Sequence, residues 1–239
     1  MDSTTTAGAL PKGKPFRDAT RVLTSVLAPL EKRTLVWLAA RMPARIHSDH
    51  LTGLALVAML GAGLSFWLTA ITPAGYPLVV LFLAVNWFGD SLDGTLARVR
   101  RHERPRYGFY VDHVVDAFGI LFLVGGMALS GLMTPLVALG FLVAYFMLSI
   151  EVYLATYTVG TFTISYFKVG PTELRILLAI GTLVAAADPT RALFGREFLL
   201  FDIGGVVAIA GVLATTVVSA ARHTRLLYRA EPLPGRARR

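Results

Sequence analysis

Hydrophobic residues gather in six long windows along the chain, separated by short polar breaks rich in proline and glycine. A helix needs about 20 apolar residues to cross the roughly 30 Å hydrocarbon core of a bilayer. The windows have about this length, and they cover residues 51–71, 76–97, 108–131, 134–156, 171–187 and 201–221. The pattern predicts an all-α fold, a polytopic membrane protein with six transmembrane helices.

A shorter stretch of helical spacing precedes the first window. Its apolar positions recur every three or four residues, with charged residues between them: Phe16, Ala19, Leu23, Val26, Leu27 and Leu30 against Arg17, Asp18, Arg21 and Glu31. This spacing predicts an N-terminal amphipathic helix that lies in the membrane interface. Packing of that helix on the protein's own cytoplasmic surface fits the pattern equally well.

Composition supports a membrane protein. The chain has 239 residues, of which 55% are hydrophobic and only 16% are charged, against roughly 25% charged in soluble domains. It contains no cysteine, which excludes disulfides, thiolate metal sites and cysteine nucleophiles. In so apolar a chain, the net charge of +8 favours contact with anionic lipid headgroups, and we expect no nucleic-acid partner.

The basic residues are distributed unevenly. Eight Lys and Arg precede the first window, five lie between the second and third, two are Lys168 and Arg175, and six follow from Arg222 onward. Only Arg191 and Arg196 fall on the other face. Because Lys and Arg gather on cytoplasmic segments, we expect both termini to be cytoplasmic in an inner, cytoplasmic membrane. We divide the chain into an N-terminal segment (1–46), a membrane domain (47–222) and a basic tail (223–239).

Four aspartates lie where membrane segments rarely keep them. Asp90 and Asp93 are near the cytoplasmic end of the second window, and Asp112 and Asp116 are just inside the third. Each carboxylate costs at least about 2.5 kcal/mol at the bilayer centre. Residues three or four apart share a helix face, so a hairpin of these two helices brings the four carboxylates together.

Such a concentration of negative charge needs neutralisation. Divalent cations of the Mg²⁺ type bind carboxylates and leave positions for water and substrate phosphates. Small residues at Gly94 and Ala97 leave room for a nucleotide beside the helix. The alternative is an ion network with loop arginines such as Arg98 and Arg100, but such a network requires neither the helical phasing nor the glycines.

The segment 90–116 resembles the signature of the CDP-alcohol phosphotransferase family. All eight fixed positions are present over 27 residues: Asp90, Asp93, Gly94, Ala97, Arg98, Gly108, Asp112 and Asp116. The six-window layout and residues 46–52 are also similar. There, Ser48-Asp49 replaces the usual Pro-Asn, and Asp49 can still cap the helix.

The resemblance implies an integral membrane enzyme that cleaves the pyrophosphate of a CDP-linked substrate, joins one half to a hydroxyl and releases CMP. It implies two Mg²⁺ or Mn²⁺ ions bound by Asp90, Asp93 and Asp112, with Asp116 as an additional ligand and the general base. It also implies a homodimer. The nucleotide site implied by the resemblance consists of Asp93, Gly94, Ala97, Arg98 and Gly108.

The substrate halves are a separate question. The leading hypothesis is transfer of the phosphatidyl group from CDP-diacylglycerol to a small polar alcohol: inositol or its phosphate, glycerol 3-phosphate, or serine. One alternative takes CDP-choline or CDP-ethanolamine with diacylglycerol as acceptor. Another, of a different class, is a cation transporter that uses the aspartates as its ion site, although these lie at the cytoplasmic edge rather than the midplane.

Weaker signals concern single residues. Arg101, Lys168 and Arg175 are candidates for an acceptor's anionic headgroup, but snorkelling at the membrane surface explains them equally well. Glu151, within the fourth window, is expected to act either as an acid behind the metal site or as the partner of an arginine. His113 turns about 100° from Asp112 on a helix, which indicates helix packing or contact with a nucleotide edge.

Overall fold

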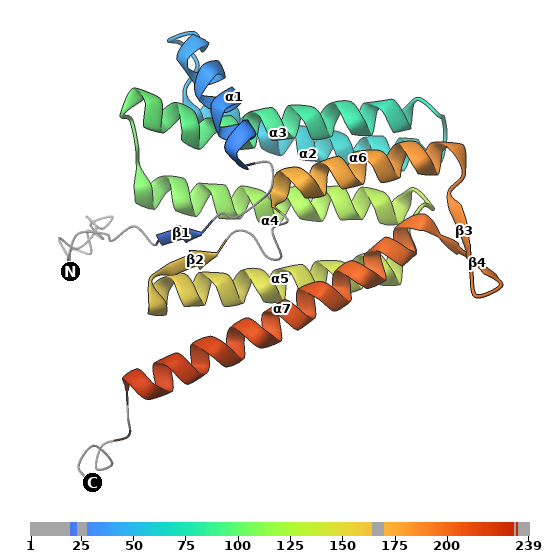
Figure 1. The fold of residues 1–239 in the computed structure, drawn as a ribbon. Helices are drawn as coiled ribbons and strands as arrows, with labels where there is room; N and C mark the ends of the chain where they lie inside the picture. Colours follow the sequence, from blue (N-terminus) through green and yellow to red (C-terminus); the bar gives the residue numbers. More distant parts are fainter. Residues whose placement is uncertain (1–19, 23–27, 164–169, 232, 234–239) are drawn as a thin grey trace, which may run out of the picture.

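Seven α-helices make up most of the described chain in the computed structural model (Figure 1). The structure describes residues 20–22, 28–163, 170–231 and 233. The helices are α1 (Ala28–Arg41), α2 (Ser48–Leu68), α3 (Gly75–Arg100), α4 (Pro105–Leu129), α5 (Pro135–Val159), α6 (Pro171–Ala187) and α7 (Leu200–Ala230). Short strands pair as β1 (Thr20–Val22) with β2 (Thr161–Thr163), in parallel, and β3 (Thr190–Leu193) with β4 (Arg196–Leu199), antiparallel.

Five of these helices, α2, α3, α4, α5 and α7, are long and apolar enough to cross a membrane. The protein is therefore a polytopic membrane protein, as the hydrophobic pattern predicts. The window at 171–187 corresponds to α6, which has 17 residues and a length of about 26 Å at 1.5 Å per residue. The last helix continues to Ala230 rather than ending near 221, because helical structure can extend past the apolar window into water.

Proline and glycine set several of the helix ends. Pro105, Pro135 and Pro171 occupy the first turn of their helices, where the missing N–H has no intrahelical partner to lose. Gly160 ends α5 with φ 77°, a left-handed conformation that glycine adopts without steric cost.

The N-terminal prediction is partly wrong. Thr20–Val22 form strand β1 rather than helix, and the helix begins only at Ala28; positions 16–19 and 23–27 of the predicted helix lie outside the described residues. A three-residue strand paired with distant backbone is too short to leave a periodic signal. Helix α1 packs Leu35 and Ala39 against a core cluster shared with α2 and α3, so its described part covers the protein's own surface.

Glycines allow the membrane helices to approach closely. A Cβ at Gly63 of α2 would lie 2.1 Å from the carbonyl oxygen of Phe122 in α4, and one at Gly126 would lie 2.0 Å from the oxygen of Gly63. A Cβ at Gly89 would lie 2.7 Å from the oxygen of Leu51. Small residues at such crossings bring backbones into contact, and the Gly89 crossing fixes α3 on α2 beside Asp90.

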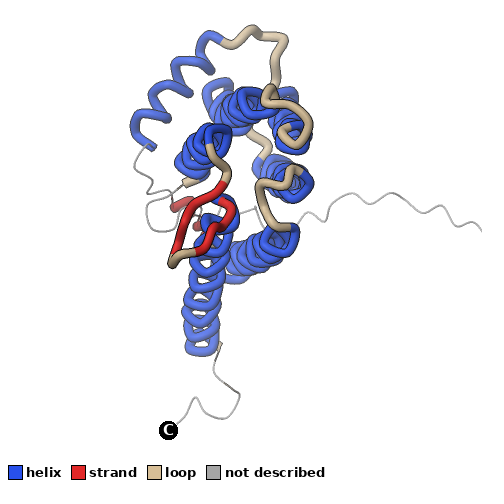
Figure 2. Tube along the Cα trace, turned by 90° about the vertical axis from the view of Figure 1, so that its right-hand side faces the viewer, coloured by secondary structure: helices blue, strands red, loops and turns tan. Residues whose placement is uncertain are grey.

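The helices α2 to α7 run alongside one another, and α1 crosses α3 (Figure 1). Viewed nearly end-on, the β3–β4 hairpin lies at the near end of the molecule, in front of the helices (Figure 2). The α3–α4 loop and the end of α7 lie at the opposite end. This end carries the basic loop residues from Arg98 to Arg106, whereas Arg191 and Arg196 are on the hairpin.

Candidate active site

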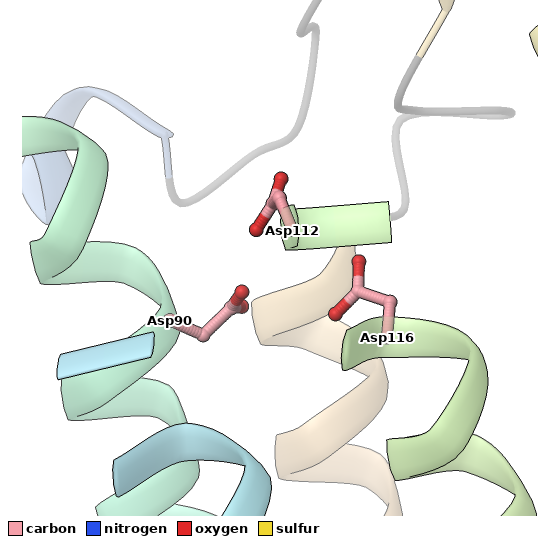
Figure 3. A group of neighbouring side chains, drawn as sticks. All are labelled: Asp90, Asp112 and Asp116. Carbon is pink, nitrogen blue, oxygen red and sulfur yellow. The ribbon is translucent and has the colours of Figure 1, made fainter. Parts of the chain in front are cut away.

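Three carboxylates converge between α3 and α4. Asp90 comes from α3, while Asp112 and Asp116 lie one turn apart on α4. One oxygen from each carboxylate lies within 4.8 Å of the others, and Figure 3 shows the three side chains turned toward a common space. We call this group the carboxylate cluster. It contains three of the four aspartates expected to meet in the predicted hairpin.

Asp93 is outside this group. Its Oδ2 accepts a hydrogen bond of 2.6 Å from the Thr52 hydroxyl of α2, and its Oδ1 accepts one from the backbone N–H of Gly94. Asp93 therefore faces α2, although it remains close enough to interact electrostatically with Asp90.

A cation from α6 balances part of the cluster's charge. Arg175 Nη2 pairs with Asp90 Oδ2 at 2.5 Å, and its Nε donates to Asn86 Oδ1 at 2.7 Å. Asn86 in turn donates to the backbone oxygen of Ala55 at 3.0 Å. Asn86, one turn before Asp90 on α3, thus connects α3 with α2 and α6. Its contact with Arg175 holds that guanidinium against the Asp90 carboxylate.

The cluster lies toward one end of the helices. Helix α3 has 26 residues and is about 39 Å long, which exceeds the roughly 30 Å hydrocarbon core. Asp90 lies about 15 Å from the Arg100 end of α3, and Asp112 about 10 Å from the Pro105 end of α4, at 1.5 Å per residue. The cluster is therefore nearer to this end of the helices than to the middle of the bilayer.

The two glycines of the motif differ in their surroundings. A Cβ at Gly108 would meet nothing within 4 Å, and the nearest atom to one at Gly94 would be Arg98 Nη1 at 3.3 Å. Arg98 Nη2 donates to the Thr95 hydroxyl at 3.0 Å. Ala97 lines a pocket of about 410 Å³ between the start of α2 and the α3–α4 loop. This volume is within the usual range for small-molecule sites, about 300 to 1,000 Å³.

The remaining candidates are dispersed. Arg101 ends α3 in the left-handed region, with φ 57°, and is exposed. Lys168 lies outside the described residues. Among the described residues the partner of Glu151 is His223 on α7, with Oε1 2.6 Å from Nδ1, rather than the arginine that one of the two expectations named. The His113 ring packs against Phe109, with centroids 4.2 Å apart, and edge-on against Tyr153 of α5, with centroids 4.9 Å apart. This is a helix-packing position.

Three polar residues at the site were not singled out from the sequence: Thr52, Asn86 and Glu31. Glu31 Oε1 on α1 accepts hydrogen bonds from Trp87 Nε1 at 2.8 Å, Ser91 Oγ at 3.1 Å and Thr172 Oγ1 at 2.7 Å. The sequence does contain a feature that could have identified Asn86, because this polar residue lies one turn before Asp90 within an apolar window. No such feature marks Glu31, because its partners are distant along the chain.

The donor set suits a hard divalent cation. Three carboxylates share a small space, and Arg175 is paired with only one of them. Mg²⁺ and similar ions prefer such oxygen ligands, whereas the thiolate and imidazole ligands that favour softer metals are missing from this group. The residues present therefore fit a metal of this type.

The fold and the cluster together define a polytopic membrane protein with a carboxylate site at one end of its helices. The sequence model of the CDP-alcohol phosphatidyltransferase family matches residues 46–220, so the chain belongs to this family. Membership implies that the protein is a metal-dependent transferase. The match also confirms that segment 90–116 resembles the signature of this family. A comparison with individual curated proteins finds no significant match.

Proposed function

We propose that this protein transfers the phosphatidyl group of CDP-diacylglycerol to the hydroxyl of a small polar alcohol and releases CMP. The observation that carries the proposal is the convergence of Asp90, Asp112 and Asp116 within a chain of this family. The candidate acceptors are inositol or its phosphate, glycerol 3-phosphate and serine.

Each residue has a distinct role in the proposed reaction. Asp90, Asp93 and Asp112, with Asp116, would hold two Mg²⁺ or Mn²⁺ ions, which would supply charge neutralisation at the pyrophosphate and stabilise the leaving CMP. Asp116 accepts the proton of the acceptor hydroxyl. The hydroxyl oxygen forms a bond to the phosphorus of the phosphatidyl group as the bond from that phosphorus to CMP breaks.

In this proposal the nucleotide and the acceptor contact different sets of residues. Gly94, Ala97, Arg98 and Gly108, with Asp93, contact the cytidine diphosphate, which the open space beside Gly108 supports. Arg101, Lys168 and Arg175 bind the anionic group of the acceptor. The guanidinium of Arg175 supports this role because it already lies against Asp90.

We also propose six membrane spans, with α6 as the fifth. Both termini and the active site then face the cytoplasm, which agrees with the excess of Lys and Arg at that end. A homodimer completes the proposal. Light scattering of the purified protein in detergent tests the dimer, and cysteine labelling of single-cysteine variants on both loop faces tests the orientation, since the native chain has no cysteine.

The central experiment measures CMP release by the purified protein. CDP-diacylglycerol is supplied with each acceptor in turn, in Mg²⁺ or Mn²⁺, and CDP-choline with diacylglycerol forms the comparison. We expect release with CDP-diacylglycerol and one polar acceptor, and loss of release in EDTA. Release only from CDP-choline with diacylglycerol would reverse the substrate halves, and full activity in EDTA would exclude the metal assignment.

A second experiment separates the base from the ligands. Asp116→Asn keeps the shape of the side chain but cannot accept a proton, so kcat falls by about 10² to 10⁴ with little change in CDP-lipid binding. Asp93→Asn weakens binding of the CDP lipid instead. If both variants lose binding equally, Asp116 is a ligand first and another group is the base.

A further inference from the structure

A carboxylate oxygen of α1 joins α3 to α6. Glu31 lies half-buried in the first turn of α1. Its Oε1 accepts hydrogen bonds from Trp87 Nε1 at 2.8 Å, Ser91 Oγ at 3.1 Å and Thr172 Oγ1 at 2.7 Å. Trp87 and Ser91 belong to α3, whereas Thr172 belongs to α6. One side chain outside the carboxylate cluster therefore connects both helices.

The three donors lie beside the residues of the Arg175–Asp90 ion pair. On α3, Trp87 comes one turn before Asp90, and Ser91 comes directly after it. On α6, Thr172 comes one turn before Arg175. The ion pair, with Arg175 Nη2 2.5 Å from Asp90 Oδ2, makes a second connection between the same helices. The spacing of α3 and α6 is thus set by the shared acceptor on α1 as well as by the ion pair.

The first half of α6 depends on these polar contacts. No residue from 171 to 180 is buried, and the buried residues of this helix, Thr182 and Ala185, lie in its second half. A segment with few buried apolar side chains moves at low cost in free energy. Loss of the acceptor on α1 would therefore release the part of α6 that carries Arg175.

The position of α6 decides where one donor of Arg175 points. The Nε of this guanidinium donates to Asn86 and its Nη2 to Asp90. Its Nη1 is buried and has no hydrogen-bond partner among the described residues. A buried guanidinium N–H without an acceptor is costly, so Nη1 is a donor held ready for an oxygen of a bound molecule.

We propose that Glu31 is a positioning residue: its Oε1 sets the spacing of α3 and α6, and thereby places Arg175 Nη1 for an oxygen of the acceptor alcohol. The inference rests on the proposed function, in which Arg175 binds the acceptor. Glu31 acts only through the two helices and touches no substrate. Its loss should weaken acceptor binding and spare the nucleotide site, which α3 and α4 form around Gly94 and Gly108.

Steady-state kinetics of CMP release test this role. The acceptor is whichever of inositol, inositol phosphate, glycerol 3-phosphate and serine gives release with CDP-diacylglycerol. We expect Glu31→Ala to raise the KM for this acceptor about tenfold or more, with kcat and the Kd for CMP changed by less than about threefold. An unchanged acceptor KM, or an equal loss of CMP binding, would overturn the proposal.

Two variants serve as references for Glu31→Ala. Glu31→Gln keeps an oxygen acceptor for the three donors and should recover most of the lost affinity for the acceptor alcohol. Glu197→Ala removes a carboxylate from an exposed position of β4 and should retain the native KM. A KM in Glu31→Gln as high as in Glu31→Ala would show that the oxygen acceptor is not what matters.

A further variant tests the contact with α6 alone. Thr172→Val replaces the hydroxyl by a methyl group of similar size and leaves Glu31 bound to α3. It should raise the acceptor KM about threefold or more in the native background. It should have no further effect in Glu31→Ala, because both changes remove the same hydrogen bond. Independent, multiplying increases in KM would overturn the proposal.

Spin-label distances test the helix spacing without catalysis. The native chain has no cysteine, so Val57→Cys on α2 and Leu177→Cys on α6, both exposed, take labels specifically. In nanodiscs, the distance distribution should broaden or shift in Glu31→Ala and in Thr172→Val. It should keep its native form in Glu31→Gln and in Glu197→Ala. A native distribution in Glu31→Ala would overturn the proposal.

The kinetic and distance measurements distinguish failure of this role from failure of the proposed function. If no CDP-linked substrate gives CMP release, the proposed function fails, while the distances still decide whether Glu31 positions α6. If CMP is released normally and Glu31→Ala changes neither the acceptor KM nor the distances, the function stands and the positioning role is wrong.

Discussion

The carboxylate cluster makes a prediction about stability that requires no substrate. Asp112→Asn removes one of three charges whose oxygens lie within 4.8 Å of one another. At an effective dielectric constant of about 20, two unit charges at that distance repel by about 3.5 kcal/mol. Asp112 has two carboxylate neighbours no farther away than this, so with all three groups ionised and no metal bound it contributes at least about 7 kcal/mol of repulsion before the Arg175 charge beside Asp90 offsets part of it. The variant relieves this repulsion.

Asp112→Asn also removes a carboxylate that we propose as a metal ligand. A metal that binds only the folded state stabilises it by about 2.7 kcal/mol at a concentration of one hundred times Kd. We expect the Tm of Asp112→Asn in EDTA to equal or exceed that of the native protein, and its increase in Mg²⁺ to be lost. The assay is thermal unfolding of purified protein at pH 8, in EDTA and in Mg²⁺.

The control is Asp188→Asn, which removes an exposed carboxylate at the hairpin end. This variant should keep the full Mg²⁺-dependent rise in Tm. The reasoning would be refuted if Asp112→Asn unfolded at a lower temperature in EDTA and still gained the native increment in Mg²⁺, because the cluster would then be neither repulsive nor a metal site.

Three further predictions concern other parts of the molecule. Gly63→Leu places a side chain 2.1 Å from the Phe122 carbonyl and should lower the Tm strongly or prevent folding, whereas a normal Tm would show that α2 and α4 are farther apart. Gly94→Leu should abolish CMP binding in titration calorimetry while the Tm is kept, and unchanged affinity would place the nucleotide elsewhere. Hydrogen bonds from the Thr190 N–H and hydroxyl lower the pKa of Asp188. Its contribution to stability is therefore present above the unfolded value of about 3.9 and is lost as pH falls through the lower folded value. The Tm difference between Asp188→Asn and the native protein should vanish at low pH, and a difference that persists there would contradict this linkage.

Much of the helical layout could be predicted because the bilayer imposes it. The apolar window at 171–187 coincides with α6, and the one at 76–97 lies within α3. The bilayer does not constrain structure outside its core. The extension of α7 to Ala230 and the strand at Thr20–Val22 were consequently missed.

For the candidate site, the features set by periodicity within one helix could be predicted, and the contacts between helices could not. Asp112 and Asp116 share a face by helical periodicity alone, and Asp90 meets them because adjacent helices in a hairpin must pack. The side-chain partners across helices could not be predicted. Whether Asp93 faces Thr52 or the cluster, and whether Asp90 meets Arg175, depends on the rotation of each helix about its axis, which no spacing within one helix determines.

The contacts of Glu31 have a consequence for the order in which the chain assembles. Glu31 lies before the first membrane helix, yet its partner Thr172 follows it by 141 positions. At about 5 to 20 residues per second of synthesis, this separation corresponds to roughly 7 to 28 s. Helix α1 therefore cannot complete its contacts until α6 has been made and inserted, so its docking is a late step of biogenesis that joins the beginning of the chain to its finished membrane domain.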